Sequence, residues 1–147
     1  MASVTVIRSI QAPVNIVFHT VADADQFAKA IIGVTKLEFL STHTTGHGTR
    51  FRQSRSINGK ETAMDFEIAE YVKDERVRII NETHGTIWDS LITLEVQGPT
   101  TKLTMHMTAK SNRLVPKLLL PLICLFIAKA VGKDFDAVKM YCEQIKK

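Results

Sequence analysis

Four polar side chains are the candidates for chemistry: Gln53, Arg55, Asn81 and Ser90. In segments where polar and apolar residues alternate, each of them has an apolar residue two positions away on at least one side. Residues two apart in a strand point to the same face, so these groups are expected to point into an apolar interior. There they could orient a polar group on an apolar ligand, and the guanidinium of Arg55 suits a carboxylate, phosphate or enolate oxygen. The alternative stays open that Arg55 reaches solvent near a turn, Gln53 pairs with backbone and Ser90 fills space beside Trp88.

Five large and adaptable side chains share the same expected interior: Met64, Phe66, Trp88, Met105 and Met107. Thioethers and aromatic rings repack around ligands of varied shape, which favours a pocket wall. The same side chains could equally form a solid core, and the sequence leaves both interpretations open. Together with the four polar residues they form the predicted ligand-binding set.

The sequence lacks the motifs of metal, nucleotide and triad chemistry. The histidines, His19, His43, His47, His84 and His106, form no HExxH, no H-x-E pattern with paired cysteines and no triad order. Gly46 and Gly48 lack the lysine and following helix of a phosphate-binding loop. The alternation places four acidic residues on the water-facing side of the strands: Asp65, Glu67, Asp89 and Glu95. It places Tyr71 on the face opposite to Met64 and Phe66. We expect no metal, no cofactor and no assignable catalytic residue, which favours a binding protein over an enzyme.

The elements that must position these residues follow from periodicity and turn residues. Residues 3–11 predict a strand, the helical spacing of apolar residues from Val14 to Val21 predicts a helix, and Asp23 is expected to cap a second short helix ending at residue 30. From residue 34 to 111 the period is two, with strands expected near 34–41, 48–57, 60–72, 75–83, 86–97 and 100–111. Asn58-Gly59 predicts a type I′ hairpin turn.

The last third of the chain predicts one long amphipathic helix from about Leu114 to Lys146. Pro116 and Pro121 fall in its first turns, so the helix is expected to begin late or to bend near residue 121. A sheet of seven strands with one apolar face needs a cover, and this helix is the remaining apolar element. The sequence thus predicts an α+β fold in which a curved antiparallel sheet grips a long C-terminal helix.

Three stretches carry a resemblance to a known superfamily. Residues 9–18 read SIQAPVNIVF, residues 47–51 read HGTRF, and Val138-Lys139 is followed by Glu143. In this order and spacing they resemble the opening s-I-x-A-P-x-x-V-F, the G-x-G-T-x-F strand and the closing L-K-x-x-x-E of the START-like (SRPBCC) superfamily of polyketide cyclases, lipid-transfer domains and the birch-pollen allergen. The resemblance covers essentially the whole chain and implies the helix-grip fold. It also implies a pocket for sterols, lipids, polyketides or plant hormones, in which some members catalyse cyclisation or dehydration.

The composition is that of one globular domain over residues 1–147. Hydrophobic residues make up 45% and charged residues 23%, which excludes a disordered chain. The net charge is +4, but the basic residues are scattered, so no nucleic-acid partner is expected. Cys124 and Cys142 would lie about 27 Å apart on one helix, beyond disulfide reach. Reduced thiols and the lack of a signal-peptide pattern predict a cytoplasmic protein.

Three functions remain open from the sequence. The first is binding or carrying a small hydrophobic ligand that is lipid-like, sterol-like or polyketide-like. The second is a polyketide-type cyclase or dehydratase in which Arg55 stabilises an enolate. The third is a lipid exchanger at the membrane surface, because the start of the last helix is apolar all round. Four residues at the start of that helix are predicted to contact a membrane surface or a second subunit of a homodimer: Leu118, Leu119, Leu122 and Phe126.

Overall fold

The computed structural model describes residues 2–57, 59–83, 85–111 and 120–145. Its elements follow in the order β1 (Ala2–Ile10), α1 (Val14–Ala22), α2 (Ala24–Ala30), β2 (Val34–Phe39), β3 (Arg50–Ile57), β4 (Lys60–Val72), β5 (Arg76–Thr83), β6 (Thr86–Gln97), β7 (Thr100–Ser111) and α3 (Leu120–Ile145). The predicted order of strand, two helices, six strands and a long helix is confirmed.

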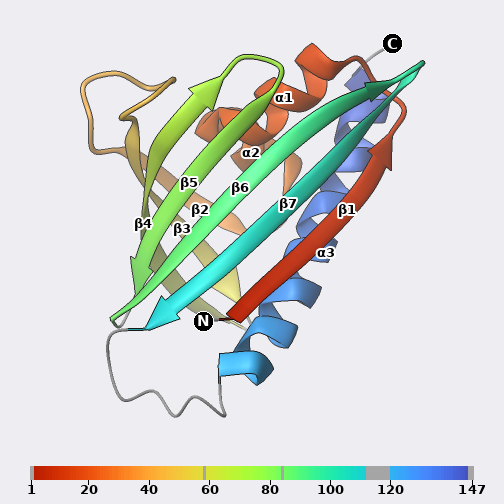
Figure 1. Cartoon of the computed structure of the whole chain (residues 1–147). Helices are drawn as coiled ribbons and strands as arrows, with labels where there is room; N and C mark the ends of the chain where they lie inside the picture. The colour runs from red at the N-terminus through yellow and green to blue at the C-terminus, as the bar shows by residue number, and fades with distance from the viewer. Residues whose placement is uncertain (1, 58, 84, 112–119, 146–147) are drawn as a thin grey trace.

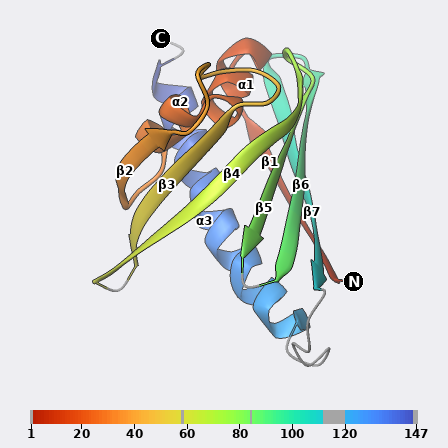
Figure 2. The same ribbon diagram turned by 90° about the vertical axis from the view of Figure 1, so that its left-hand side faces the viewer.

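The strands form one antiparallel sheet in the order β1-β7-β6-β5-β4-β3-β2. Consecutive hairpins build the sheet from β2 to β7, and β1 then pairs along the free edge of β7. The sheet curves around α3, and α1 and α2 lie together at one end of it (Figure 1, Figure 2). We call the face toward α3 the inner face, and it is the face that positions the predicted ligand-binding residues.

The predicted strands begin and end within two residues of the observed ones. The largest difference at a strand start is in β3, which is expected from residue 48 and begins at Arg50. Gly46 and Gly48 both adopt positive φ, 88° and 85°, which is the left-handed region that favours glycine. Thr49 is still part of this turn, because its Oγ1 donates a hydrogen bond to the Gly46 carbonyl at 2.8 Å. The turn still meets β4, because the Gly48 N–H donates to the Ile68 carbonyl and the Ile68 N–H donates to the Thr49 carbonyl, both at 2.8 Å. The regular pairing of β3 begins at Arg50.

Tyr71 lies on the inner face, and its predicted polar-face position is wrong. A bulge between Ile68 and Glu70 in β4 shifts the register, so side chains beyond it change face. Tyr71 then pairs with buried Val77, and its ring meets that of Phe18 edge to face with centroids 5.1 Å apart. One extra residue in the strand thus brings a phenol into the interior.

Asp23 stands at the N-cap position of α2, as expected, but its carboxylate makes no capping hydrogen bond. Its Oδ1 accepts hydrogen bonds from Tyr71 Oη at 3.0 Å and from Thr45 Oγ1 at 2.8 Å. Its Oδ2 lies 2.9 Å from Nδ1 of His19. The prediction of a side-chain cap is therefore wrong: the carboxylate ties the junction of α1 and α2 to β4 and to the loop before β3.

α3 is continuous from Leu120 to Ile145, so Pro121 occupies its first turn, where a missing N–H costs least. Pro116, Leu118 and Leu119, which the prediction places in the same helix, lie outside the described residues. Gly132, in the middle of α3, is helical and buried.

The second half of α3 is fastened to the edge strand β1. Arg8 Nε donates to Asp136 Oδ1 at 2.6 Å. Lys139 Nζ donates to the Ser9 carbonyl at 2.7 Å and to Glu143 at 2.8 Å. The lysine and glutamate of the closing stretch therefore anchor the helix to the start of the sheet.

Candidate functional site

The interior between the inner face and α3 has a closed half and an open half. The closed half lies where α1 packs, and its largest side chains are almost fully buried: Phe18, Ile68, Val77, Leu103, Phe135 and Val138. We call the inner-face side chains that are only half-buried the open half: Met64, Phe66, Ile79, Trp88 and Ser90 from the sheet, and Ile127 and Val131 from α3. All of them except Met64 and Ser90 pack on one side against the core. Apolar groups that point toward the helix yet keep accessible surface make the open half the candidate binding site.

Gln53 of β3 borders this half. Its side chain points to the inner face, opposite Met64 of β4 and Leu37 of β2, and the residue is only 7% exposed. Within the described residues its carboxamide makes no hydrogen bond. Neither amide atom is among the fully enclosed polar atoms that lack a partner, so the carboxamide keeps accessible surface as a donor and an acceptor for a bound molecule.

Arg55, two residues further along β3, is hydrogen-bonded through both of its terminal nitrogens. Its two terminal nitrogens donate to the two carboxylate oxygens of Asp134 on α3, at 2.8 and 2.9 Å. Nη2 also donates to the Ile32 carbonyl at 2.8 Å. Only Nε, which is buried, has no partner among the described residues. A carboxylate therefore already neutralises the guanidinium beside the open half.

Asn81 is hydrogen-bonded to the protein, as Arg55 is, whereas Ser90 has no side-chain partner among the described residues, like Gln53. Asn81 is buried, its Nδ2 donates to the Asp65 carbonyl at 2.7 Å, and its Oδ1 accepts from Thr83 at 2.8 Å. Ser90 is half-buried between Ile79 and Met107 in the sheet register and makes no side-chain hydrogen bond among the described residues. Asn81 thus holds two strands together, while the hydroxyl of Ser90 remains open.

The five predicted apolar residues all lie on the inner face. Met105 and Met107 are buried, whereas Met64, Phe66 and Trp88 keep part of their surface. The ring of Phe66 stacks on Phe51 with centroids 5.3 Å apart. The two buried methionines form the floor between β6 and β1, and the other three form the exposed wall.

Sequence reasoning missed the cluster of Asp23, His19, Thr45 and Tyr71, because the bulge that turns Tyr71 inward leaves no mark in the alternation. Burial is the main cause that raises the pKa of the Tyr71 phenol above its usual value. Every polar member of the cluster has a partner within it. It therefore acts as a tie between elements.

The described parts of the chain contain neither a candidate metal site nor a helix that could cross a membrane. Residues 2–57, 59–83, 85–111 and 120–145 contain no group of three or more His, Cys, Asp or Glu placed to hold a metal ion. Among the same residues, no helix combines the length and the apolar character that a bilayer requires. Cys124 and Cys142 are buried free thiols whose pKa values burial raises.

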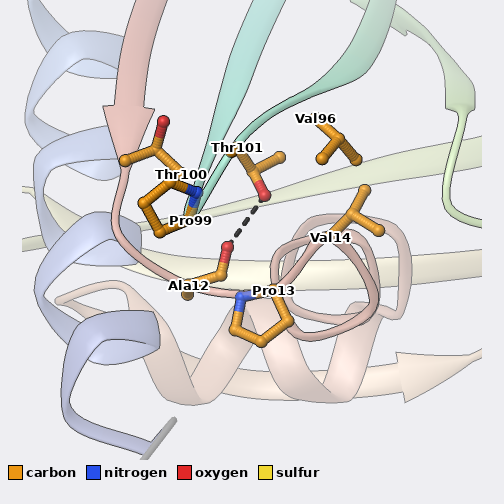
Figure 3. A pocket seen from close by; sticks show the side chains of 8 residues that line it. Ala12, Pro13, Val14, Val96, Pro99, Thr100 and Thr101 are labelled. Carbon is orange, nitrogen blue, oxygen red and sulfur yellow. Dashed lines mark hydrogen bonds between the residues drawn. The ribbon is translucent and has the colours of Figure 1, made fainter.

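A surface pocket of about 320 Å³ lies apart from the open half (Figure 3). The β6–β7 hairpin and the start of α1 line it, with Ala12, Pro13, Val14, Val96, Gly98, Pro99, Thr100 and Thr101. Two of the lining residues are joined by a hydrogen bond, which Thr101 Oγ1 donates to the Ala12 carbonyl at 2.8 Å (Figure 3). The lining includes no residue of α3 and no member of the predicted ligand-binding set.

Comparisons with known proteins place the fold. No model of a protein family matches the chain, and no curated protein sequence does. Among solved structures, the protein TTHA0849 from Thermus thermophilus is similar at a TM-score of 0.79 and 18% identity, covering 99% of this chain and 100% of that one. A START superfamily protein from Mycobacterium smegmatis is similar at 0.78 and 12% identity, covering 97% and 98%.

The di-domain ARO/CYC BexL from the BE-7585A biosynthetic pathway is similar at a TM-score of 0.78 and 16% identity, covering 95% of this chain and 46% of that one. At these identities the likeness shows the fold alone. The chain has the START-like, or SRPBCC-like, helix-grip fold.

Proposed function

We propose that this protein binds a small apolar molecule carrying one neutral hydrogen-bonding group, in the open half of the interior. The observation that carries the proposal is Gln53, which is buried yet free, among the described residues, to donate and accept hydrogen bonds. The half-buried apolar side chains around it would supply affinity by burial, at about 25 cal/mol per Å² of apolar surface. A ligand hydroxyl or carbonyl would pair with the carboxamide.

The charge of the site favours a neutral ligand over an anionic one. The guanidinium of Arg55 is held in two hydrogen bonds by Asp134. A ligand carboxylate or enolate would have to displace Asp134 and leave that carboxylate unpaired in a partly buried place, which is costly. For the same reason binding is favoured over a cyclase or dehydratase reaction that needs a free Arg55 to stabilise an enolate.

Displacement of Nile red, a neutral dye that fluoresces in apolar sites, tests this proposal. Dodecanol and dodecanoate share one chain and differ only in the polar group. We expect dodecanol to displace the dye at a lower concentration, and Gln53→Leu to weaken dodecanol by roughly five- to tenfold, the worth of one hydrogen bond in a buried site. Gln97→Leu, at an exposed glutamine at the end of β6, is the matched control and should change nothing.

Two results would contradict the proposal. One is stronger displacement by dodecanoate that Gln53→Leu leaves intact, which would point to Arg55 as the anchor. The other is no dye binding by a protein whose circular dichroism is that of the folded chain, which would mean that the open half closes in solution.

A further inference from the structure

The first turns of α3 expose a group of large apolar side chains. Leu122, Leu125 and Phe126 are 62%, 63% and 73% exposed, and Ile123 is 38% exposed. We call these four residues the α3 patch. Figure 1 and Figure 2 show this end of α3 reaching past the sheet, on the side of the molecule away from α1 and α2. Single exposed apolar residues are ordinary, but four within five positions mark an interaction surface.

Positive charge borders the α3 patch. Exposed Lys129 and Lys133 continue the helix face of Leu122 and Phe126, since residues three to four apart stack along one side of a helix. The sequence between Glu95 and Asp134 contains no acidic residue. The nearest carboxylate on this helix, Asp134 next to Lys133, is already paired with Arg55. An apolar patch with such a basic rim complements an anionic lipid surface.

We propose that the α3 patch docks this protein on anionic lipid membranes, inserting its apolar side chains at the interface while Lys129 and Lys133 meet the headgroups. A second copy of the chain fits the patch less well. A parallel pair of helices would bring the lysines of the two copies together. In either orientation the four side chains offer a few hundred Å², well under the roughly 800 Å² per partner of a stable interface. A lipid surface meets both conditions, because it is anionic and needs only shallow insertion.

The docking surface adjoins the open half but does not depend on it. Ile127, one turn beyond Ile123, is half-buried and belongs to the open half. Docking would therefore set that half next to the lipid interface. The docking proposal is separate from the proposed ligand binding, because it rests on outward-facing residues of α3.

Flotation with lipid vesicles tests the docking proposal. We expect the protein to float with vesicles of phosphatidylcholine and phosphatidylserine at low salt, less with phosphatidylcholine alone, and less again at high salt, since salt screens the lysines. Leu125→Glu or Phe126→Glu should lower the partitioning of the protein onto vesicles roughly tenfold or more, because each removes one apolar side chain that would insert into the membrane. Met140→Glu is the matched control: Met140 is 64% exposed on the same helix, well outside the patch, and should float unchanged.

Binding that resists Leu125→Glu and Phe126→Glu, or no flotation with anionic vesicles, overturns the proposal. So does a dimer in analytical ultracentrifugation that Leu125→Glu dissociates, since a second copy would then cover the patch. Nile red binding without vesicles separates the two proposals. It should be the same in Leu125→Glu as in the unaltered protein, so a failure of docking leaves the ligand-binding result readable.

Discussion

Arg55 on β3 and Asp134 on α3 form a two-pronged ion pair, with nitrogen-to-oxygen distances of 2.8 and 2.9 Å. Two residues along the helix, Asp136 pairs with Arg8 on β1. β1 is one edge of the sheet, and β3 is next to the other edge. The helix is therefore tied across the sheet at one level. The α3 patch and the helix side of the open half lie on the N-terminal side of that level.

Asp134→Ala is expected to lower the free energy of unfolding by about 2 kcal/mol, because it leaves the partly buried Arg55 charge without its partner. The side chains of the pair are only 28% and 15% exposed. Urea unfolding measures the change. Asp65→Ala, which removes the exposed pair with Arg52, is the control and should change stability little. Equal losses in the two variants would show that the Arg55–Asp134 pair has no special weight.

Gln53→Leu is expected to raise the free energy of unfolding of the ligand-free protein by about 1 kcal/mol. The mostly buried carboxamide loses part of its hydration without gaining a protein partner, and leucine fills a similar volume without that cost. The same substitution should weaken ligand binding, so stability and affinity would move in opposite directions. A loss of stability in urea unfolding would mean that the carboxamide has a protein partner in solution.

Glu70 should contribute to acid sensitivity. Hydrogen bonds from Arg76 and, next in weight, Arg78 hold its pKa below the ordinary value of 4.5. A carboxylate whose pKa is lower in the folded than in the unfolded state stabilises the fold above pH 4.5, and this contribution is lost as pH falls through the lower folded value. Glu70→Gln should therefore melt below the unaltered protein at neutral pH and match it in strong acid. A difference in melting temperature that is constant with pH would contradict this role.

Tyr71 should ionise late in an alkaline titration. Burial raises its pKa above 10.0, and the neighbouring Asp23 carboxylate adds to the shift. The chain has two tyrosines, so the phenolate absorbance of Tyr71→Phe isolates the other one. We expect the difference between the two titrations, which belongs to Tyr71, to have its midpoint above pH 10.0. A midpoint at or below pH 10.0 would instead place the Tyr71 phenol in solvent.

The fold could be predicted from the sequence because its signals are local. The alternation of apolar and polar residues places Met105 and Met107 on the inner face. Turn sequences with glycine, such as Asn58-Gly59, predict the hairpins. These features depend on residues that are close together in the chain, and the observed strands follow them within two residues. The resemblance to the superfamily rests on the same local stretches, and the structural likeness bears out the fold.

The candidate site could be predicted only in part. Strand parity places Gln53 and Arg55 on the inner face, but nothing local shows that Arg55 meets a carboxylate 79 positions away. The alternation predicts the wrong face for Tyr71, because a bulge of one residue in β4 exchanges the two faces of the strand and no residue type marks the bulge in the sequence. Which polar group is free and which is satisfied depends on tertiary contacts, and that difference is what favours a neutral ligand.

Methionine methyl NMR tests most directly whether a ligand enters the open half. Met64 and Met107 lie on the inner face, while Met140 is exposed on α3, outside the α3 patch. On titration of the isotope-labelled protein with dodecanol, we expect the methyl signals of Met64 and Met107 to shift together and saturate, and that of Met140 to stay in place. Unchanged inner-face signals, or a shift of Met140 alone, would contradict binding between the sheet and the helix.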